Sequence, residues 1–421
     1  DVHSALRVAQ HKDRAILQRI VALQDELDWL CYRLYGLTDE DLCHSGEVPP
    51  VSLGERSFEI ALARRMASGE AESTWFQRHG SKPITEIPDH WPADYRALVE
   101  RRLEAIEENR WVKLVEQPEY KRRWNREPWE NRQQRALEEW LLDRLEAEVK
   151  ACGPALVTCA RLTDHIRHDA RVQEAATLYA GHDLIDLQQL VGELVAGYEV
   201  PQMAAARLKP AAIKKYRAWQ ETWDKQRLED AIDTECGLAE PLSEADEAEP
   251  AKVRAFEAAR KRAEARKASE VGTIPIPPKY AAGDFRKSSY WSLRGKLDVP
   301  KERCFSLPGC EKPGDTTLVI GWAGLNQVQR AQAIAAWYVE RKDQDGWQAE
   351  QLMPMLVALE ELLPWLKQWH NELDPEFGER MGDFYEGFLF EELRQLELTR
   401  EDLLAWQPVP VKRQRRRKAK T

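Results

Sequence analysis

The first 36 residues repeat apolar side chains at alternating spacings of four and three: Ile16, Ile20, Leu23, Leu27, Leu30 and Leu34. This alternation is typical of the seam along which one helix packs against another. It predicts one long helix, and Gly36 is well placed to end it because glycine adopts a left-handed cap at little cost. We therefore expect residues 1–48 to form a long helix or helical hairpin, with the seam packed on another helix.

Helical patterns continue through residues 49–235, interrupted by prolines at positions where helices end. The predicted helices are Glu55–Met66, Ala93–Glu108, Trp129–Val149, Leu184–Val195 and Ala211–Leu228. We interpret residues 49–235 as a helical domain. The next stretch, 236–250, is acidic and poor in large apolar residues, as linkers are. With the exposed helix predicted for Ala251–Glu270, it forms a connecting region at 236–270.

Residues 271–410 have a mixed pattern. Short β-branched and aromatic runs at Arg303–Leu307 and Thr316–Ile320, flanked by Gly and Pro, predict strands. Three predicted helices follow, at Asn326–Arg341, Ala349–Gln368 and Asp383–Leu396. We expect a compact α+β domain over 271–410 and a disordered basic tail over 411–421. The whole chain is then mainly α with a small β element.

The charge of the chain is unevenly distributed. The formal net charge is −10, yet Lys412 to Lys420 contain seven Lys and Arg and no acid. An acidic body argues against uniform coating by nucleic acid. No stretch approaches the roughly 18 apolar residues that a membrane span needs, and the start lacks an apolar signal segment. We expect a cytoplasmic protein with no membrane partner, and a fragment, because it begins with Asp1 rather than Met.

One segment departs from the acidic background, because it interleaves cations with aromatic rings between Asp284 and Lys296. Cations contact phosphates and flat rings stack on bases, so this composition favours nucleic-acid contact. We expect its charged side chains to be exposed. The alternative is a solvated loop whose rings enter the core. The candidate DNA-binding residues are Arg286, Lys287, Tyr290, Trp291, Arg294, Lys296, Lys301 and Arg303, with a second cluster at Lys121, Arg122 and Arg123.

His165 and His168 lie three residues apart on a predicted helix and could share a face. No second cluster supplies the remaining ligands of a metal site in a recognisable pattern. We interpret both as surface histidines and predict no metal site.

Three blocks near the end of the chain are dense in Trp, Gly and Pro. They are Asp298-Val-Pro-Lys-Glu-Arg303, Leu318-Val-Ile-Gly-Trp-Ala-Gly324 and Leu362-Leu-Pro-Trp-Leu-Lys-Gln-Trp-His-Asn371. They resemble the C-terminal region of the adenine-specific DNA methyltransferases of type 2 BREX (phage growth limitation) defence systems. The resemblance implies a cytoplasmic enzyme that transfers a methyl group from S-adenosylmethionine to N6 of adenine in host DNA, within a multi-protein antiviral, restriction-modification-like system.

The motifs that this chemistry needs have no match here. An adenine methyltransferase uses an Asn/Asp-Pro-Pro-aromatic loop on the flipped adenine. Ile276-Pro-Pro-Lys-Tyr280 lacks the polar acceptor, and Asp374-Pro-Glu-Phe377 has a single proline. Gly321-Trp-Ala-Gly324 follows a predicted strand, but two glycines are a weak cofactor signal, and a tight strand-to-helix connection explains them better.

We therefore predict a non-catalytic region with no catalytic residue and no cofactor of its own, S-adenosylmethionine being implied only for the full-length enzyme. The expected partners are DNA, the catalytic methyltransferase region in cis and other BREX proteins. The alternative is a protein-binding scaffold of the defence complex that does not touch DNA.

Overall fold

The computed structural model describes residues 1–124, 126–295, 301–375 and 378–408. The tail predicted for 411–421 lies outside these ranges. Within them the chain is mainly helical with one small four-stranded sheet, which confirms the predicted fold class. The chain divides into two compact units, Asp1–Leu137 and Glu138–Thr421. In the described ranges, no helix has the length and apolar content needed to cross a bilayer.

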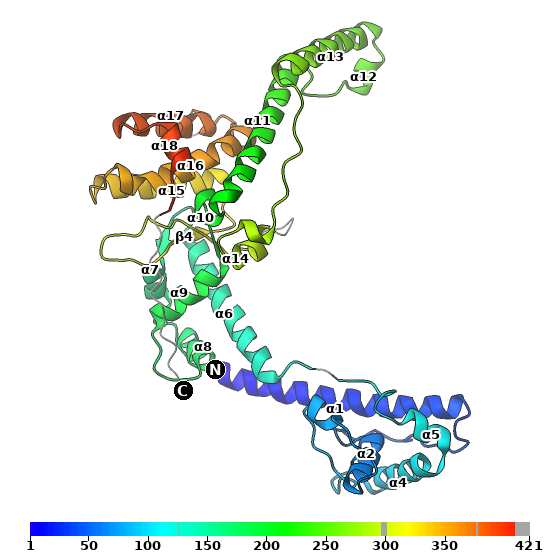
Figure 1. Ribbon diagram of the computed structural model, residues 1–421. Coiled ribbons are helices and arrows are strands. Elements are labelled where there is room, and N and C mark those ends of the chain that lie inside the picture. Colours follow the sequence, from blue (N-terminus) through cyan, green and yellow to red (C-terminus); the bar gives the residue numbers. More distant parts are fainter. Residues whose placement is uncertain (125, 296–300, 376–377, 409–421) are drawn as a thin grey trace. The chain divides into compact units, whose positions relative to one another are not determined.

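The first unit consists of helices and connecting loops (Figure 1). Its helices are α1 (Val2–Leu34), α2 (Ser57–Ala67), α3 (Trp75–His79), α4 (Ala93–Glu108) and α5 (Arg110–Val115), and α6 (Trp129–Ala151) begins within it. Asp1 caps α1 by accepting a hydrogen bond from the backbone N–H of Ser4. Gly36 follows the helix with a φ of 67°, as the sequence predicted.

The core of the first unit places a charged group among apolar side chains. Val21 and Trp29 of α1 cluster with Tyr95 and Leu98 of α4. The guanidinium of Arg102, on the same helix, is completely buried. It donates hydrogen bonds to the carboxylates of Asp25 (3.1 Å) and Glu26 (2.7 Å) and to the carbonyl oxygen of Leu42. Burial outweighs this pairing at Asp25 and raises its pKa to about 6.

The α1 residues that enter this core are not the predicted seam. The buried positions are Val21, Ala22, Asp25, Trp29 and Tyr32, which lie on another face of the helix. The seam itself, which we call the α1 stripe, is 40 to 72% exposed. The expectation that it packs on a second helix is therefore not met within the residues that the structure describes. The α1 stripe comprises Ile16, Ile20, Leu23, Leu27, Leu30 and Leu34.

The second unit is organised by a sheet of very short strands. They are β1 (Val157–Thr158), β2 (Glu199–Pro201), β3 (Cys304–Ser306) and β4 (Val319–Trp322), in the order β1-β4-β3-β2. β2 and β3 are parallel, with Val200 opposite Phe305, and the other two pairs are antiparallel. Both predicted strands are therefore present: β3 lies within the predicted Arg303–Leu307, and β4 is shifted from the predicted Thr316–Ile320. The two further strands were too short to show a period.

The second unit also contains the helices that follow α6. They are α7 (Cys159–Ile166), α8 (Ala170–Ala180), α9 (Leu187–Tyr198), α10 (Ala204–Arg207), η1 (Pro210–Ala212), α11 (Ile213–Glu235), α12 (Glu244–Glu247), α13 (Pro250–Glu270), η2 (Ala282–Asp284), α14 (Ser288–Tyr290), the π-helical η3 (Trp291–Gly295), α15 (Gln327–Asp343), α16 (Ala349–Trp369), α17 (Met381–Gln395) and α18 (Arg400–Ala405).

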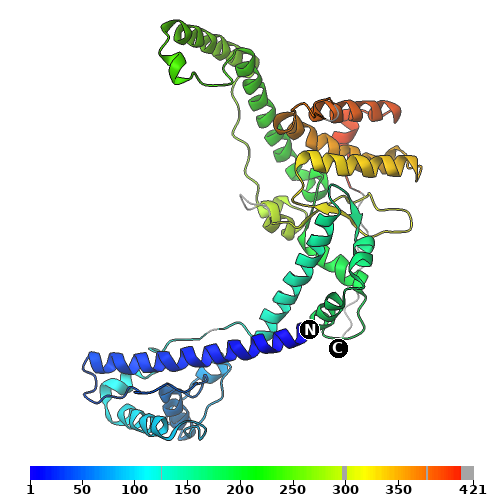
Figure 2. The ribbon, with the colours of Figure 1, turned by 180° about the vertical axis from the view of Figure 1, so that it is seen from behind.

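Helices α15, α16 and α17 lie side by side in both views (Figures 1 and 2). They form the largest apolar core of the chain, and side chains of the sheet join it. Phe305 of β3 and Val319 of β4 are completely buried together with Tyr338 of α15 and Leu359 of α16. The C-terminal helices and the sheet are thus one structural body.

The grouping of these elements differs from the predicted domains. β1 and β2 come from the predicted helical domain 49–235, whereas β3 and β4 come from the predicted domain 271–410, and all four share one sheet. The boundary between the compact units falls instead within α6. The region 236–270 contains α12 and α13, and α13 packs on α11, where Lys267 pairs with Asp233 at 2.6 Å. Local composition does not report strand pairing, which is why the sequence placed the boundary elsewhere.

The buried pairing of Arg102 leads to a stability prediction. Replacement by leucine (Arg102→Leu) leaves the carboxylate of Asp25 and the carbonyl of Leu42 without their donor. We expect a loss of about 3 to 5 kcal/mol, as for other buried pairs from which one partner is removed. The neighbouring Arg101, paired with Glu40 while about half exposed, is the matched control. Arg101→Leu should cost less than about 1 kcal/mol. Urea unfolding of both variants measures the difference, and equal midpoints would contradict it.

Candidate functional site

The sequence-predicted cluster at 284–303 lies between η2 and β3, beside the sheet. Arg286, Lys287 and Lys301 are exposed, as expected. Tyr290 is buried, and Phe285 packs on Trp291 with ring centroids 5.6 Å apart. Lys296 lies outside the described residues. The rings of this segment therefore enter the core, as in the alternative interpretation.

A buried carboxylate anchors the segment to the sheet. Glu199, at the start of β2, accepts hydrogen bonds from the hydroxyl of Tyr290 (2.9 Å), the ammonium of Lys287 (3.0 Å) and the hydroxyl of Ser306 (2.5 Å). Burial and this negative charge raise the pKa of Tyr290. The same group thus joins strands β2 and β3 and holds the cation-bearing segment against them.

The remaining cations of the segment are held by specific partners. The Nε of Arg286 donates to the carbonyl oxygens of Ala205 (2.9 Å) and Leu208 (2.8 Å). Arg294 pairs with Glu302, whose side chain is 1% exposed. The expectation that all these cations are exposed thus fails for Arg294, because an acid eight residues along the chain neutralises it in the interior.

Arg303 is likewise paired with acidic residues instead of being free at the surface. It pairs with Asp143 (2.6 Å) and Glu146 (2.7 Å) of α6, and its side chain is mostly buried. A single sequence window does not show such partners, because they come from distant parts of the chain.

In the second predicted cluster, one of the three cations is also buried and paired with acidic residues. Lys121 is buried and donates hydrogen bonds to the carboxylate of Asp28 (2.9 Å) and the hydroxyl of Tyr32 (2.9 Å), and it pairs with Glu116. This burial counts against phosphate contact by Lys121. Arg122 and Arg123 are exposed, with the Arg122 guanidinium 4.7 Å from the ring centroid of Trp124.

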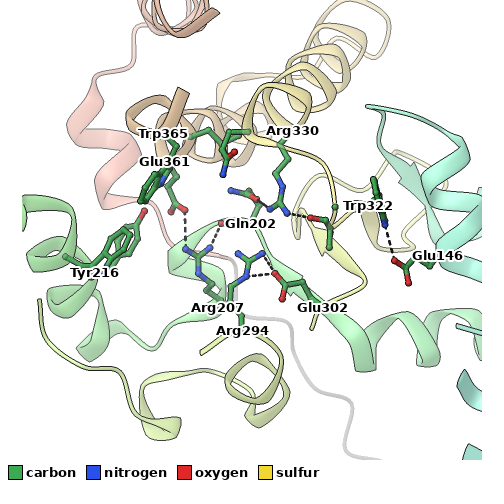
Figure 3. Close-up of a pocket in the computed structure, with 15 residues that line it drawn as sticks. Glu146, Gln202, Arg207, Tyr216, Arg294, Glu302, Trp322, Arg330, Glu361 and Trp365 are labelled. Atoms are coloured by element: carbon green, nitrogen blue, oxygen red, sulfur yellow. Dashed lines mark hydrogen bonds and ion pairs between the residues drawn. The ribbon is translucent and has the colours of Figure 1, made fainter. Parts of the chain in front are cut away.

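A cavity of about 580 Å³ opens in the second unit where α10, α11, η3, α16 and the β4–α15 connection meet (Figure 3). Of its lining residues, Arg294 belongs to the predicted cluster, and the others were not predicted. The lining comprises Glu146, Gln202, Arg207, Tyr216, Trp219, Arg294, Glu302, Trp322, Ala323, Gly324, Gln327, Arg330, Glu361, Leu362 and Trp365.

Three guanidinium groups face this cavity (Figure 3). Arg294 pairs with Glu302, and Arg207 lies 3.8 Å from a carboxylate oxygen of Glu361. Among the residues that the structure describes, Arg330 donates to neutral groups alone: the side-chain oxygen of Gln202 (3.0 Å) and the carbonyl oxygens of Leu325 and Ala323. Burial, together with the like charges of Arg294 and Arg207, lowers the pKa of Arg330 to about 10.

Aromatic rings form another part of the cavity wall. Trp219 of α11 and Trp365 of α16 have centroids 5.4 Å apart and are tilted against each other. The Tyr216 hydroxyl donates to the carboxylate of Glu361, whose pKa is raised by burial. Trp322, at the end of β4, donates from its indole N–H to Glu146 at 3.1 Å. Guanidinium groups beside exposed ring faces bind anions and stack on flat ligands.

Two glycines allow close packing at the end of β4 and in the connection that follows it. A Cβ at Gly321 would lie 2.4 Å from the Phe305 ring, and one at Gly324 would lie 2.4 Å from the Trp322 ring. Gly321-Trp-Ala-Gly324 is thus the tight connection from β4 to α15 that the sequence predicted. The glycines are needed for close packing of aromatic rings. The motif also marks the position of the cavity in the sequence, because Trp322 and Gly324 line the cavity.

No group of three or more His, Cys, Asp or Glu residues able to hold a metal ion occurs in the part of the chain that the structure describes. His165, on α7, and His168, just after it, are both exposed. The cavity is therefore built from hydrogen-bonding, charged and aromatic groups.

Comparison with known proteins places the chain among its relatives. A family model described as a domain of unknown function, DUF7008, matches residues 20–418. The adenine-specific methyltransferase PglX of Streptomyces coelicolor is 42% identical over 424 residues, which cover 99% of this chain and 32% of PglX. No solved structure matches the chain. The predicted resemblance is thus confirmed: the chain belongs to the DUF7008 family and corresponds to a C-terminal region of PglX.

Proposed function

We propose that this chain is a non-catalytic region of a BREX anti-phage N6-adenine DNA methyltransferase and that it helps to hold DNA. Its identity with PglX extends over nearly all of its length, although it spans about a third of that enzyme. The chain itself carries no Asn/Asp-Pro-Pro-aromatic sequence. The binding of S-adenosylmethionine and the methyl transfer then belong to the rest of the enzyme, acting in cis in the cytoplasm with other BREX proteins.

One observation carries the DNA-binding proposal: the 284–303 segment presents exposed cations from a backbone that is fixed to the sheet. Glu199 holds Tyr290 and Lys287, and Arg286 is bonded to two backbone carbonyls, so the segment has a defined position. Cations on a fixed surface set the register of a protein on the phosphate backbone without reading its sequence. Lys301 adds a further exposed ammonium to the same segment.

The first test of this function concerns catalysis. The isolated chain should transfer no labelled methyl group from S-adenosylmethionine to unmethylated DNA, because the loop that holds the flipped adenine is missing. A filter-binding assay with tritiated cofactor measures this, with an active adenine methyltransferase as positive control. Incorporation above the level without protein would contradict the non-catalytic assignment.

The second test concerns DNA contact. The double variant Lys287→Gln/Lys301→Gln removes two exposed charges and should weaken binding of double-stranded DNA. The plot of log affinity against log salt should become shallower by about one for each lost phosphate contact, because fewer counterions are released. Fluorescence anisotropy at several salt concentrations measures both quantities.

The matched control for this test is Arg254→Gln/Lys261→Gln, which removes the same charge from exposed positions of α13. It should leave the salt dependence unchanged. Equal slopes for the wild-type chain and the 287/301 variant, with both proteins folded, would favour the scaffold alternative.

A specific observation also favours assembly as a role for the region. The α1 stripe exposes six large apolar side chains at the spacing of a helix-packing seam, while the opposite side of α1 is buried in the core. Isolated exposed leucines are ordinary, but a continuous stripe marks a surface that another protein segment covers. The 4-3 spacing suits an amphipathic helix, which packs its side chains between those of the stripe. We assign this helix to the rest of the methyltransferase.

The assembly role is tested with the double variant Ile20→Glu/Leu27→Glu. It should abolish co-purification of this chain with a separately expressed remainder of the methyltransferase, because two charges would be buried in the seam. The fold should be retained, since both side chains are about half exposed. The control Leu184→Glu/Ile276→Glu makes the same change at positions that are 92% exposed. Undiminished co-purification of the stripe variant would show that another surface makes the contact.

A further inference from the structure

One guanidinium group in the cavity of the second unit lacks a carboxylate partner. The lining contains three arginines and three glutamates, so its formal charges are equal in number. Arg207 and Arg294 each have a carboxylate partner, but Arg330 makes no ion pair with a carboxylate within the described residues. Its hydrogen bonds to neutral oxygens leave N–H donors of the two terminal nitrogens unassigned. Arg330, which is partly buried, is therefore the point of the cavity at which an anion would be held.

The carboxylate partner of Arg294 is out of reach of a ligand. The side chain of Glu302 is 1% exposed, Oε1 accepts from Arg294, and Oε2 is buried. The groups that a ligand can engage are therefore the guanidinium groups and the aromatic rings.

The third feature is a flat apolar surface. Trp219 and Trp365 are only partly buried, and they line the same cavity as the arginines. Stacking of a nucleobase on an aromatic side chain is sequence-tolerant and strong, because every base has a π-face.

We propose that this cavity binds one nucleotide, with its phosphate at Arg330 beside Arg207 and Arg294 and its base against Trp219 and Trp365. The volume of about 580 Å³ lies within the usual range of small-molecule sites. The nucleotide has two possible sources, a free mononucleotide or a residue of a DNA strand that extends into the cavity. The proposal goes beyond DNA contact by the 284–303 segment and does not depend on it.

The experiment measures binding of 2′-deoxyadenosine 5′-monophosphate (dAMP) to the whole chain by calorimetry and by quenching of tryptophan fluorescence. Three fragments are compared with it: 2′-deoxyadenosine, 2-deoxyribose 5-phosphate and inorganic phosphate. The complete nucleotide should bind at least about tenfold more tightly than each fragment, because only it engages both the arginines and the rings. Binding of dAMP no tighter than that of phosphate overturns the proposal, with an adventitious anion site as the conclusion.

Two variants locate the binding. Arg330→Gln removes the charge without leaving a carboxylate unpaired, and it should weaken dAMP binding at least about tenfold, whereas Arg330→Lys should recover part of the affinity. Trp365→Leu should weaken dAMP binding but not that of 2-deoxyribose 5-phosphate. Arg254→Gln, on α13, is the control for lost charge. Circular dichroism checks folding. If both variants are folded and bind dAMP with wild-type affinity, the proposal is overturned. If either variant unfolds, the comparison of dAMP with its fragments on the wild-type chain decides the question.

Competition with a short single-stranded oligonucleotide separates the two sources. If the oligonucleotide displaces bound dAMP at a lower concentration than free dAMP does, the cavity is assigned to a DNA strand. If the oligonucleotide does not compete, the cavity is assigned to a free mononucleotide. The Lys287→Gln/Lys301→Gln variant should bind dAMP normally. The two failures are therefore distinguishable. If the 287/301 variant keeps the wild-type DNA salt dependence while the chain binds dAMP, the proposed function fails and this inference stands. If the variant lowers the DNA salt dependence while the chain does not bind dAMP, this inference fails and the proposed function stands.

Discussion

The second unit depends on the pairing of four very short strands. β2 and β3 contribute three residues each, and β1 contributes two, so few backbone hydrogen bonds define the sheet. The carboxylate of Glu199 reinforces it, because it is buried at the β2–β3 junction and accepts from Ser306, Tyr290 and Lys287. The packing of α15 and α16 against the sheet and the position of the 284–303 segment beside it both follow from this pairing. The cavity lies where these parts meet.

Charge is distributed in both units by the same physical rule. A buried cation is tolerated where carboxylates and carbonyl oxygens surround it, as at Arg102 and Lys121 of the first unit. In the second unit, Arg294 and Arg303 follow the rule by pairing with Glu302 and with the acids of α6. Arg330 is the departure, since its partners in the described structure are neutral. Departures from a rule that the rest of a protein obeys are where a functional site is expected.

Local patterns predicted the elements well and their associations poorly. The helix expected at Ala93–Glu108 is α4 with the same bounds, and the strand expected at Arg303–Leu307 contains β3, because periodicity and helix ends are encoded locally. The heptad pattern gave the position of α1, yet the buried face is another one, since Trp29 and Asp25 meet α4 through contacts that no spacing reveals. For the same reason Arg294 was expected at the surface, and the cavity stayed unseen, because its lining comes from segments between α6 and α16.

The order of the strands along the chain has a consequence for biosynthesis. The first unit is complete once residue 137 has been made, so its core can form while the chain is still growing. β1 pairs with β4 and β2 with β3, so the strands at Val157 and Glu199 have no sheet partner until residues 304–322 have emerged. Such distant pairing is slow to form. Any chain that ends before Trp322 leaves these edges open, and ribosome stalling within this interval would expose them to aggregation.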